Sequence, residues 1–165
     1  MRFIAILLVA AAVAACGFQL RGATLLPKEL SRVHLRAANM NSVLVEKLEA
    51  QLRRSGVEIL PDETAATAVL TIVDDQADER VLSVSARGEP QEYELYHTVV
   101  FAMTTASGFV LEPTTMTLTR DYFFDEQDIL GRREDAEFLQ DALAEDVARA
   151  VVQRAALALR APGRN

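Results

Sequence analysis

The chain is 165 residues long, with 50% hydrophobic and 25% charged residues, which suits one compact domain with its own core. Seven Gly, five Pro, no Trp and a single Cys exclude collagen-like chains, low-complexity disorder and disulfide-rich mini-domains. The formal net charge of −7 argues against a nucleic-acid-binding protein, because such a protein must neutralise phosphates. An anionic ligand would therefore need a local basic patch.

The first sixteen residues have the pattern of an export signal. Arg2 precedes an apolar run over residues 3–15, which is shorter than the roughly 20 residues that span a bilayer and suits a signal peptide. The run ends in VAAC at residues 13–16, and Cys16 is the one cysteine of the chain. This ending resembles the bacterial lipobox, whose cysteine is lipidated and becomes the acylated N-terminus after cleavage. The alternative is an ordinary cleavage site with an incidental free thiol.

Lipidation of Cys16 would hold the chain on a membrane without help from the fold, since two or more acyl chains give stable anchoring. Gly17 stands where many Gram-negative lipoproteins kept in the inner membrane have Asp, which favours sorting to the outer membrane. Removal of residues 1–15 would leave 150 residues and a net charge of −8, because Arg2 is the only charge removed. We expect a signal peptide at 1–15, a lipidated tether at 16–30, a single α+β domain at 31–161 and a tail at 162–165.

The first part of the domain predicts a strand followed by a helix. Val33 and Leu35 alternate with polar residues, which is typical of a short strand. Asn41 or Ser42 can cap a helix in which leucine recurs every four residues, and Gly56 can end it. The helix has one apolar stripe, so it must pack on another element.

The middle of the chain is rich in β-forming residues. Residues 57–60 predict a brief extended piece and residues 62–67 a polar loop. Residues 68–73 and 81–86 are both rich in Val, Leu and other strand formers, and the acidic sequence DDQAD separates them at 74–78. This pattern predicts a hairpin with its turn at 74–78.

A long strand follows the break at residues 87–90. Its alternation predicts one buried face, made of Tyr93, Leu95, His97, Val99, Phe101 and Met103. Ser107 and Gly108 permit a tight reversal, after which residues 117–124 predict a returning strand.

The last element is a long helix, predicted over residues 133–159 after a loop at 125–131. Its apolar residues recur every four positions, at Leu139, Leu143, Val147, Val151 and Ala155. Taken together, the elements predict a two-layer α+β sandwich: a mainly antiparallel sheet of about four strands with two helices on one face.

No cluster of residues carries an evident catalytic motif. The sequence has neither a nucleophile elbow nor a phosphate-binding glycine loop, and its two histidines lack partners at metal-ligand spacing. We interpret His97 as a hydrogen-bonded side chain of the buried face. The acidic residues at 74–79 are interpreted as a solvated turn rather than a cation site. We therefore expect no enzyme, no cofactor and no metal.

Three stretches carry a family pattern: residues 16–22 (CGFQLRG), residues 91–95 (QEYEL), and residues 119–125 (TRDYFFD) with DILG at 128–131. In this order and on this domain plan, they make the chain similar to the outer-membrane lipopolysaccharide-assembly lipoprotein family, LptE, also called RlpB. The resemblance runs from the lipobox to the last helix.

The resemblance implies a non-catalytic subunit of the lipopolysaccharide export machine. Such a lipoprotein plugs the lumen of a large outer-membrane β-barrel, LptD, helps that barrel to fold and can bind lipopolysaccharide. The implied partners are LptD, lipopolysaccharide and, through the lipid anchor, the membrane, with no nucleic acid. The implied location is the cell outer membrane, on its periplasmic side and in the barrel lumen. Two alternatives remain: a lipid-carrier lipoprotein with a hollow apolar interior, and a structural lipoprotein of another envelope assembly complex.

Because lipopolysaccharide is polyanionic, an acidic domain must meet it through local positive charge. Arg87 and Arg120 are the candidate phosphate contacts, through their guanidinium groups. The alternatives are a solvated loop residue for Arg87 and a structural ion pair with Asp121 or Asp125 for Arg120. Four aromatic residues are candidates for contact with the barrel wall, with core packing as the alternative: Tyr93, Tyr122, Phe123 and Phe124.

Overall fold

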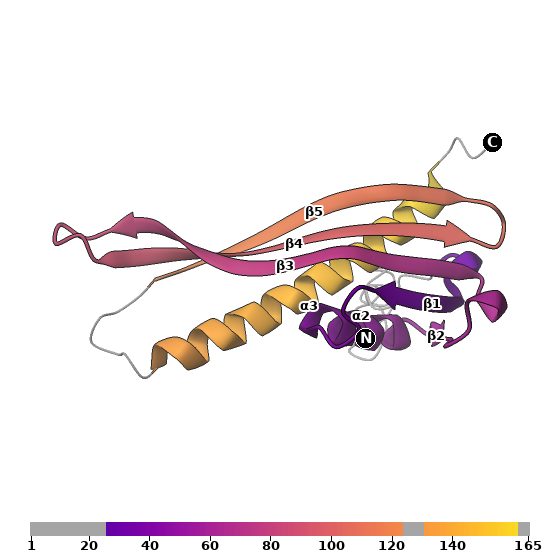
Figure 1. Cartoon of the computed structure of the whole chain (residues 1–165), viewed down its shortest axis with the longest axis horizontal. Coiled ribbons are helices and arrows are strands. Elements are labelled where there is room, and N and C mark those ends of the chain that lie inside the picture. Colours follow the sequence, from indigo (N-terminus) through magenta and orange to yellow (C-terminus); the bar gives the residue numbers. More distant parts are fainter. Residues whose placement is uncertain (1–25, 124–130, 162–165) are drawn as a thin grey trace, which may run out of the picture.

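The protein has two layers, a twisted sheet and a pair of helices on one of its faces (Figure 1). The computed structural model describes residues 26–123 and 131–161, with the side chains of the last helix described from residue 136. The helices are α2 (Val43–Arg54) and α3 (Gly131–Arg160). The predicted α+β sandwich with two helices on one face is confirmed. The expected signal peptide, Cys16, most of the tether and the 162–165 tail lie outside the described residues.

The sheet has five strands rather than about four, and it is mixed. Its order is β2-β1-β3-β4-β5. Strand β1 is parallel to both of its neighbours, β2 and β3, whereas the β3–β4 and β4–β5 pairs are antiparallel. The additional strand is β2, a two-residue piece that α2 brings back parallel to β1. The strand bounds are Arg32–Ala37 (β1), Glu58–Ile59 (β2), Ala68–Val84 (β3), Pro90–Thr105 (β4) and Val110–Phe123 (β5).

The predicted hairpin between residues 68–73 and 81–86 is wrong, because β3 is one continuous strand. The acidic stretch at 74–78 lies within the ladder, where Asp74 pairs with Val100 and Asp78 with Tyr96. The 16-residue strand β4 offers a partner along this whole length, and the solvent beside this part of β3 tolerates acidic side chains. A bulge between Ile72 and Asp74 shifts the register by one residue, so that Asp75 pairs with Val99 and takes the helix-covered face after Ile72.

The turns on either side of β4 lie where glycine allows them. Gly88, at φ +80°, is in the turn between β3 and β4, and Gly108, at φ +88°, is in the turn before β5. Because Gly108 reverses the chain at once, β5 begins at Val110 rather than at residue 117. The alternation predicted for β4 is confirmed, since all six residues of the expected face are buried.

Helix α2 has defined signals at both ends. The Ser42 hydroxyl accepts a hydrogen bond from the backbone N–H of Val45 at 3.2 Å, a cap that stabilises a helix by about 1 kcal/mol. At the other end Gly56 has φ +80° and donates to the Arg53 carbonyl, while Val57 donates to the Leu52 carbonyl. These two bonds make a Schellman motif, which ends the helix and turns Val57 into the core.

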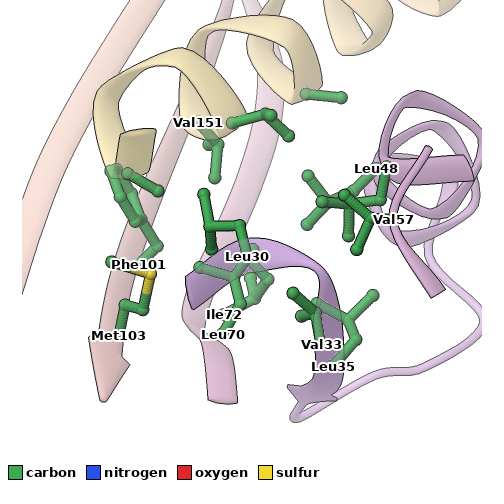
Figure 2. Packing of buried hydrophobic residues seen from close by; sticks show 14 of the residues in the cluster. Leu30, Val33, Leu35, Leu48, Val57, Leu70, Ile72, Phe101, Met103 and Val151 are labelled. Carbon is green, nitrogen blue, oxygen red and sulfur yellow. The ribbon is translucent and has the colours of Figure 1, made fainter. Parts of the chain in front are cut away.

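The core lies between the sheet and the two helices. Figure 2 shows Leu48 of α2 near Val57 and Val151 of α3 above Leu30, in the same cluster as Phe101 of β4. Phe101, Leu48 and Val151 are each 0% exposed. The packed cluster contains residues from β1, β3, β4, α2 and α3, so the described interior between the layers is filled by side chains.

Helix α3 covers the sheet with a stripe of valine, leucine and alanine that follows the predicted four-residue spacing from Leu143 to Leu159. It begins at Gly131, two residues earlier than predicted. Of the helices in the described part of the chain, none combines the length and the apolar character needed to cross a membrane.

Candidate functional site

Arg87 lies in the turn that joins β3 and β4, at the end of a hairpin that reaches beyond α2 and β1 (Figure 1). Ser85 shapes this turn: its hydroxyl accepts from the backbone N–H groups of Arg87 and Glu89, each at 3.2 Å. Arg87 is exposed, and no carboxylate of the described residues forms an ion pair with it. The guanidinium is therefore available to a ligand.

The hairpin end around Arg87 also exposes apolar side chains. Val81, Leu82 and Val84 are 47%, 43% and 58% exposed, and a register shift between Val81 and Ser83 accompanies them. A cation beside exposed apolar residues offers complementary chemistry to an anionic amphiphile, whose headgroup and acyl chains need both.

Arg120 lies on the helix-covered face of β5 and is engaged by α3. Its guanidinium donates to Asp146 at 2.8 Å, and about a third of each side chain is exposed. Asp146 also accepts from Arg149 at 2.9 Å, so one carboxylate binds two guanidinium groups. An ion pair is thus formed with a partner other than the expected ones: Asp121 points to the opposite face of the sheet from Arg120, and Asp125 lies outside the described residues.

The fold does not bring the two candidate arginines together. Arg87 belongs to the turn, whereas Arg120 pairs in register with Leu95, well inside β4 and under α3. A single phosphate site made from both guanidinium groups is therefore not formed. Contact of Arg120 with a ligand stays a prediction, and it would require the pair with Asp146 to open.

The two arginines should differ in their contribution to stability. We expect Arg120→Ala to lower the free energy of unfolding by about 1 kcal/mol, because it removes a half-buried charge-assisted bond between β5 and α3. Arg87→Ala should change it by less than about 0.5 kcal/mol, since the side chain has no partner among the described residues. Urea unfolding of both variants measures the difference. Equal losses would contradict a structural role for the Arg120 pair.

His97 is buried and hydrogen-bonded, which confirms its interpretation. It is 4% exposed, and its Nε2 atom lies 2.7 Å from Oδ1 of Asp75 on β3. The interpretation of the acidic stretch as a solvated turn is wrong, because β3 is a strand and directs Asp75 and Glu79 to the helix-covered face. There Glu79 accepts a hydrogen bond from the Tyr122 hydroxyl at 2.8 Å. Within the described ranges, no group of His, Cys, Asp and Glu is arranged to hold a metal ion.

The aromatic candidates divide between the core and the surface. Tyr93 is buried and stacks on the half-buried Tyr122 with ring centroids 5.4 Å apart, so the two rings pack on each other on the helix-covered face. Phe123 is 81% exposed on the opposite face and is the described aromatic residue best placed to contact a partner. Phe124 lies outside the described residues.

The face of the sheet away from the helices is largely polar in its long antiparallel part. Arg80 forms an ion pair with Glu94 at 2.5 Å and lies 5.9 Å from the centre of the Tyr96 ring. Farther along, the hydroxyl groups of Thr98 and Thr117 are 2.9 Å apart. This face therefore offers hydrogen-bonding groups to its surroundings.

Two titrating groups support the fold at the surface. A hydrogen bond to Asp141 of α3 raises the pKa of Lys47 of α2, so this link between the helices is lost only as the pH rises through that raised pKa. Hydrogen bonds from the backbone and hydroxyl of Thr64 lower the pKa of Asp62, whose contribution is lost as the pH falls through that lowered pKa. Both contributions are small, because Asp62 is exposed and Asp141, the partner of Lys47, is about half exposed.

The sequence of this chain matches a known protein family over most of its length. The family model LptE, described as lipopolysaccharide-assembly, matches residues 30–155. The chain belongs to the LptE family. LPS-assembly lipoprotein LptE of Photorhabdus laumondii is 28% identical over 141 residues, which cover 86% of this chain and 77% of that protein. LptE of Yersinia enterocolitica is 28% identical over 142 residues, covering 86% and 68%.

Solved structures share the LptE fold. Rare lipoprotein B from Shewanella oneidensis matches with a TM-score of 0.70 and 23% identity, over 78% of this chain and 96% of that one. Lipoprotein B from Nitrosomonas europaea matches with a TM-score of 0.72 and 22% identity, over 88% and 94%. At these identities the likeness shows the fold alone.

Membership of the LptE family confirms the resemblance that rested on three short stretches. It places the chain among the envelope lipoproteins of lipopolysaccharide assembly. The family description is one of assembly and names no reaction. That this chain catalyses none stays a prediction.

Proposed function

We propose that the protein is a lipid-anchored lipoprotein of the cell outer membrane that plugs the lipopolysaccharide-export barrel LptD and helps it to assemble. It also binds lipopolysaccharide on its way to the outer leaflet. The observation that carries the proposal is the match of residues 30–155 to the LptE family. Affinity purification of the tagged protein from outer membranes tests it, with the barrel as the expected partner.

The shape and surface of the domain support a role as a plug. A filled core between sheet and helices makes a rigid body rather than a hollow one. The sheet face opposite the helices carries the Arg80–Glu94 pair and threonine hydroxyls. Such a polar face suits the polar interior of a large outer-membrane barrel.

The lipid anchor supports a place beside the barrel. Acylation of Cys16 would attach the chain to the membrane with more than one acyl chain. Leu26, where the described residues begin, is ten positions after Cys16, so the anchor can be at most roughly 36 Å from that point. The domain is thereby kept at the periplasmic surface, within reach of the barrel lumen.

Arg87 is the residue that we propose for contact with a lipopolysaccharide phosphate. It is exposed at the end of the hairpin, and exposed Val81, Leu82 and Val84 lie close to it in the chain. The guanidinium would pair with the phosphate and the apolar residues would face the acyl chains.

We expect Arg87→Glu to weaken lipopolysaccharide binding about tenfold or more, because a repulsive charge replaces a guanidinium–phosphate contact. Arg154→Glu is the matched control, since Arg154 is also exposed but lies on α3. Binding of purified lipopolysaccharide to the two variants measures the effect, with unfolding curves to show that both are folded. Equal binding by the two variants would remove Arg87 from the site.

The two alternative functions predict different interiors and different partners for the protein. A lipid carrier needs a hollow apolar interior, and the packed cluster between the layers counts against it. A structural lipoprotein of another envelope assembly complex would copurify with that complex instead of the barrel. The same purification therefore decides between this alternative and the proposed function.

A further inference from the structure

The outer edge of β1 is paired over only part of its length. Strand β2 pairs with Arg32 and Val33, and the Leu60 N–H donates to the Val33 carbonyl at 2.9 Å. Backbone groups alternate in direction along a strand, so the N–H and C=O groups of Leu35 and Ala37 point to the same side as those of Val33. On that side neither residue has a hydrogen-bond partner in the described chain.

The chain that follows β2 does not continue the hydrogen bonds of β2 to β1. The Leu60 carbonyl, which could accept from Leu35, instead lies 3.0 Å from Nδ1 of His34. The next residue is Pro61, which has no N–H to donate. Strand β2 therefore ends here and leaves the second half of β1 open.

A pocket of about 500 Å³ lies against the open edge. Leu35, Ala37 and Ile59 contribute to its walls, with Met40 from the loop before α2 and Glu49 from α2 itself. Leu35 is only 4% exposed, yet its backbone groups on this side are unpaired. An unpaired strand edge is a template on which a further strand can form backbone hydrogen bonds.

The outward face of β1 carries positive or titratable side chains at every second position, namely Arg32, His34 and Arg36. The neighbouring chain already complements them with acidic residues: Glu58 pairs in register with Arg32, and Glu63 forms an ion pair with Arg36. Opposite charges directly across two strands are favourable. A further strand beside β1 would gain from an acidic residue on the same face.

We propose that the free edge of β1 binds an extended segment of a partner protein, which joins the sheet as an added strand. Its backbone bonds to Leu35 and Ala37, as in other cases of strand addition. Because side chains alternate, one apolar side chain enters the pocket beside Ile59 and an acidic neighbour lies on the outward face near His34 and Arg36. The recognised sequence thus alternates apolar and acidic residues.

A photo-reactive amino acid at position 40 of the full lipoprotein, in intact envelopes, tests the proposal. Met40 lines the pocket and is 47% exposed, and the same probe at Leu157, 58% exposed on α3, is the control site. We expect a cross-link from position 40 to a partner segment with alternating apolar and acidic residues, identified by mass spectrometry. Ala37→Pro removes a free N–H from the edge without removing a described hydrogen bond, and it should reduce this cross-link at least tenfold.

Arg36→Glu provides a second variant that alters only an exposed ion pair, and it should reduce the same cross-link several-fold. Circular dichroism establishes that each variant is folded. The proposal is overturned if position 40 gives no cross-link. It is also overturned if the cross-link persists unchanged in folded Ala37→Pro or in folded Arg36→Glu. A cross-link within the same chain would also overturn it, because the edge would then be occupied by the protein's own segment. None of these results depends on whether the barrel copurifies.

Discussion

Replacement of Phe101 by alanine is expected to lower the free energy of unfolding by about 3–5 kcal/mol. Phe101 is 0% exposed and lies on β4, where it packs in the cluster shared by β3 and α3. Truncation removes the transfer free energy of the ring and leaves a cavity that the surrounding strands cannot fully close. Because small domains are stable by about 5–15 kcal/mol, this one change removes a large part of the total.

The matched control is Val100→Ala, one residue away on the opposite face of the same strand. Val100 is half-buried and lies between Asp74 and Thr115 in register, away from the helices. We expect it to cost about 1 kcal/mol or less. Urea unfolding of both variants provides the comparison. A loss below about 1 kcal/mol for Phe101→Ala would contradict the placement of the core between sheet and helices.

The second large effect is expected at the pair between β3 and β4. Asp75→Ala leaves His97 buried without its partner, and we expect a loss of about 1–3 kcal/mol. Asp78→Ala is the control from the same acidic stretch, because the described side-chain contact of Asp78 is a local one to the Glu79 N–H. It should cost less than about 0.5 kcal/mol.

A double variant separates the pair from the individual side chains. Asp75→Ala combined with His97→Leu should recover part of the stability lost in Asp75→Ala, because no buried imidazole is then left unsatisfied. Denaturant unfolding of the single and double variants gives the coupling energy. If the loss in free energy of unfolding of the double variant equals the sum of the losses of the two single variants, the Asp75–His97 bond contributes little.

Local signals in the sequence were sufficient for β4 and α2. The alternation from Tyr93 to Met103 predicts a face that the structure buries entirely, and Ser42 and Gly56 predict helix ends that have the expected cap bonds. The stretch at 74–78 misleads because acidic residues favour turns when nothing else is known. Only the length of the neighbouring strand shows that these residues are paired.

The contacts around the candidate site depend on tertiary structure that no local pattern reveals. Arg120 is separated from Asp146 by 26 residues, and the pair forms because α3 crosses the helix-covered face of β5. In the same way His97 meets Asp75 only because β3 is continuous. By contrast, Gly88 indicates a turn from the sequence alone, and the structure has Arg87 in that turn.

The free edge of β1 is a feature of topology rather than of sequence pattern. Residues 57–60 predict an extended piece, but their pairing with β1 follows only from the position to which α2 returns the chain. Pro61 then determines where that pairing stops. The sheet therefore has an open position beside Leu35 and Ala37 that no periodicity could indicate.

Purification of the affinity-tagged, full-length protein from outer membranes in mild detergent tests the central claim most directly. The proposed function predicts that a large β-barrel, identified by mass spectrometry as the lipopolysaccharide-export barrel, copurifies in stable amounts with the lipoprotein. An unrelated tagged outer-membrane lipoprotein serves as the control and should not retain it. Recovery of the folded protein without that barrel, or with a different envelope complex in its place, would contradict the role as a barrel plug.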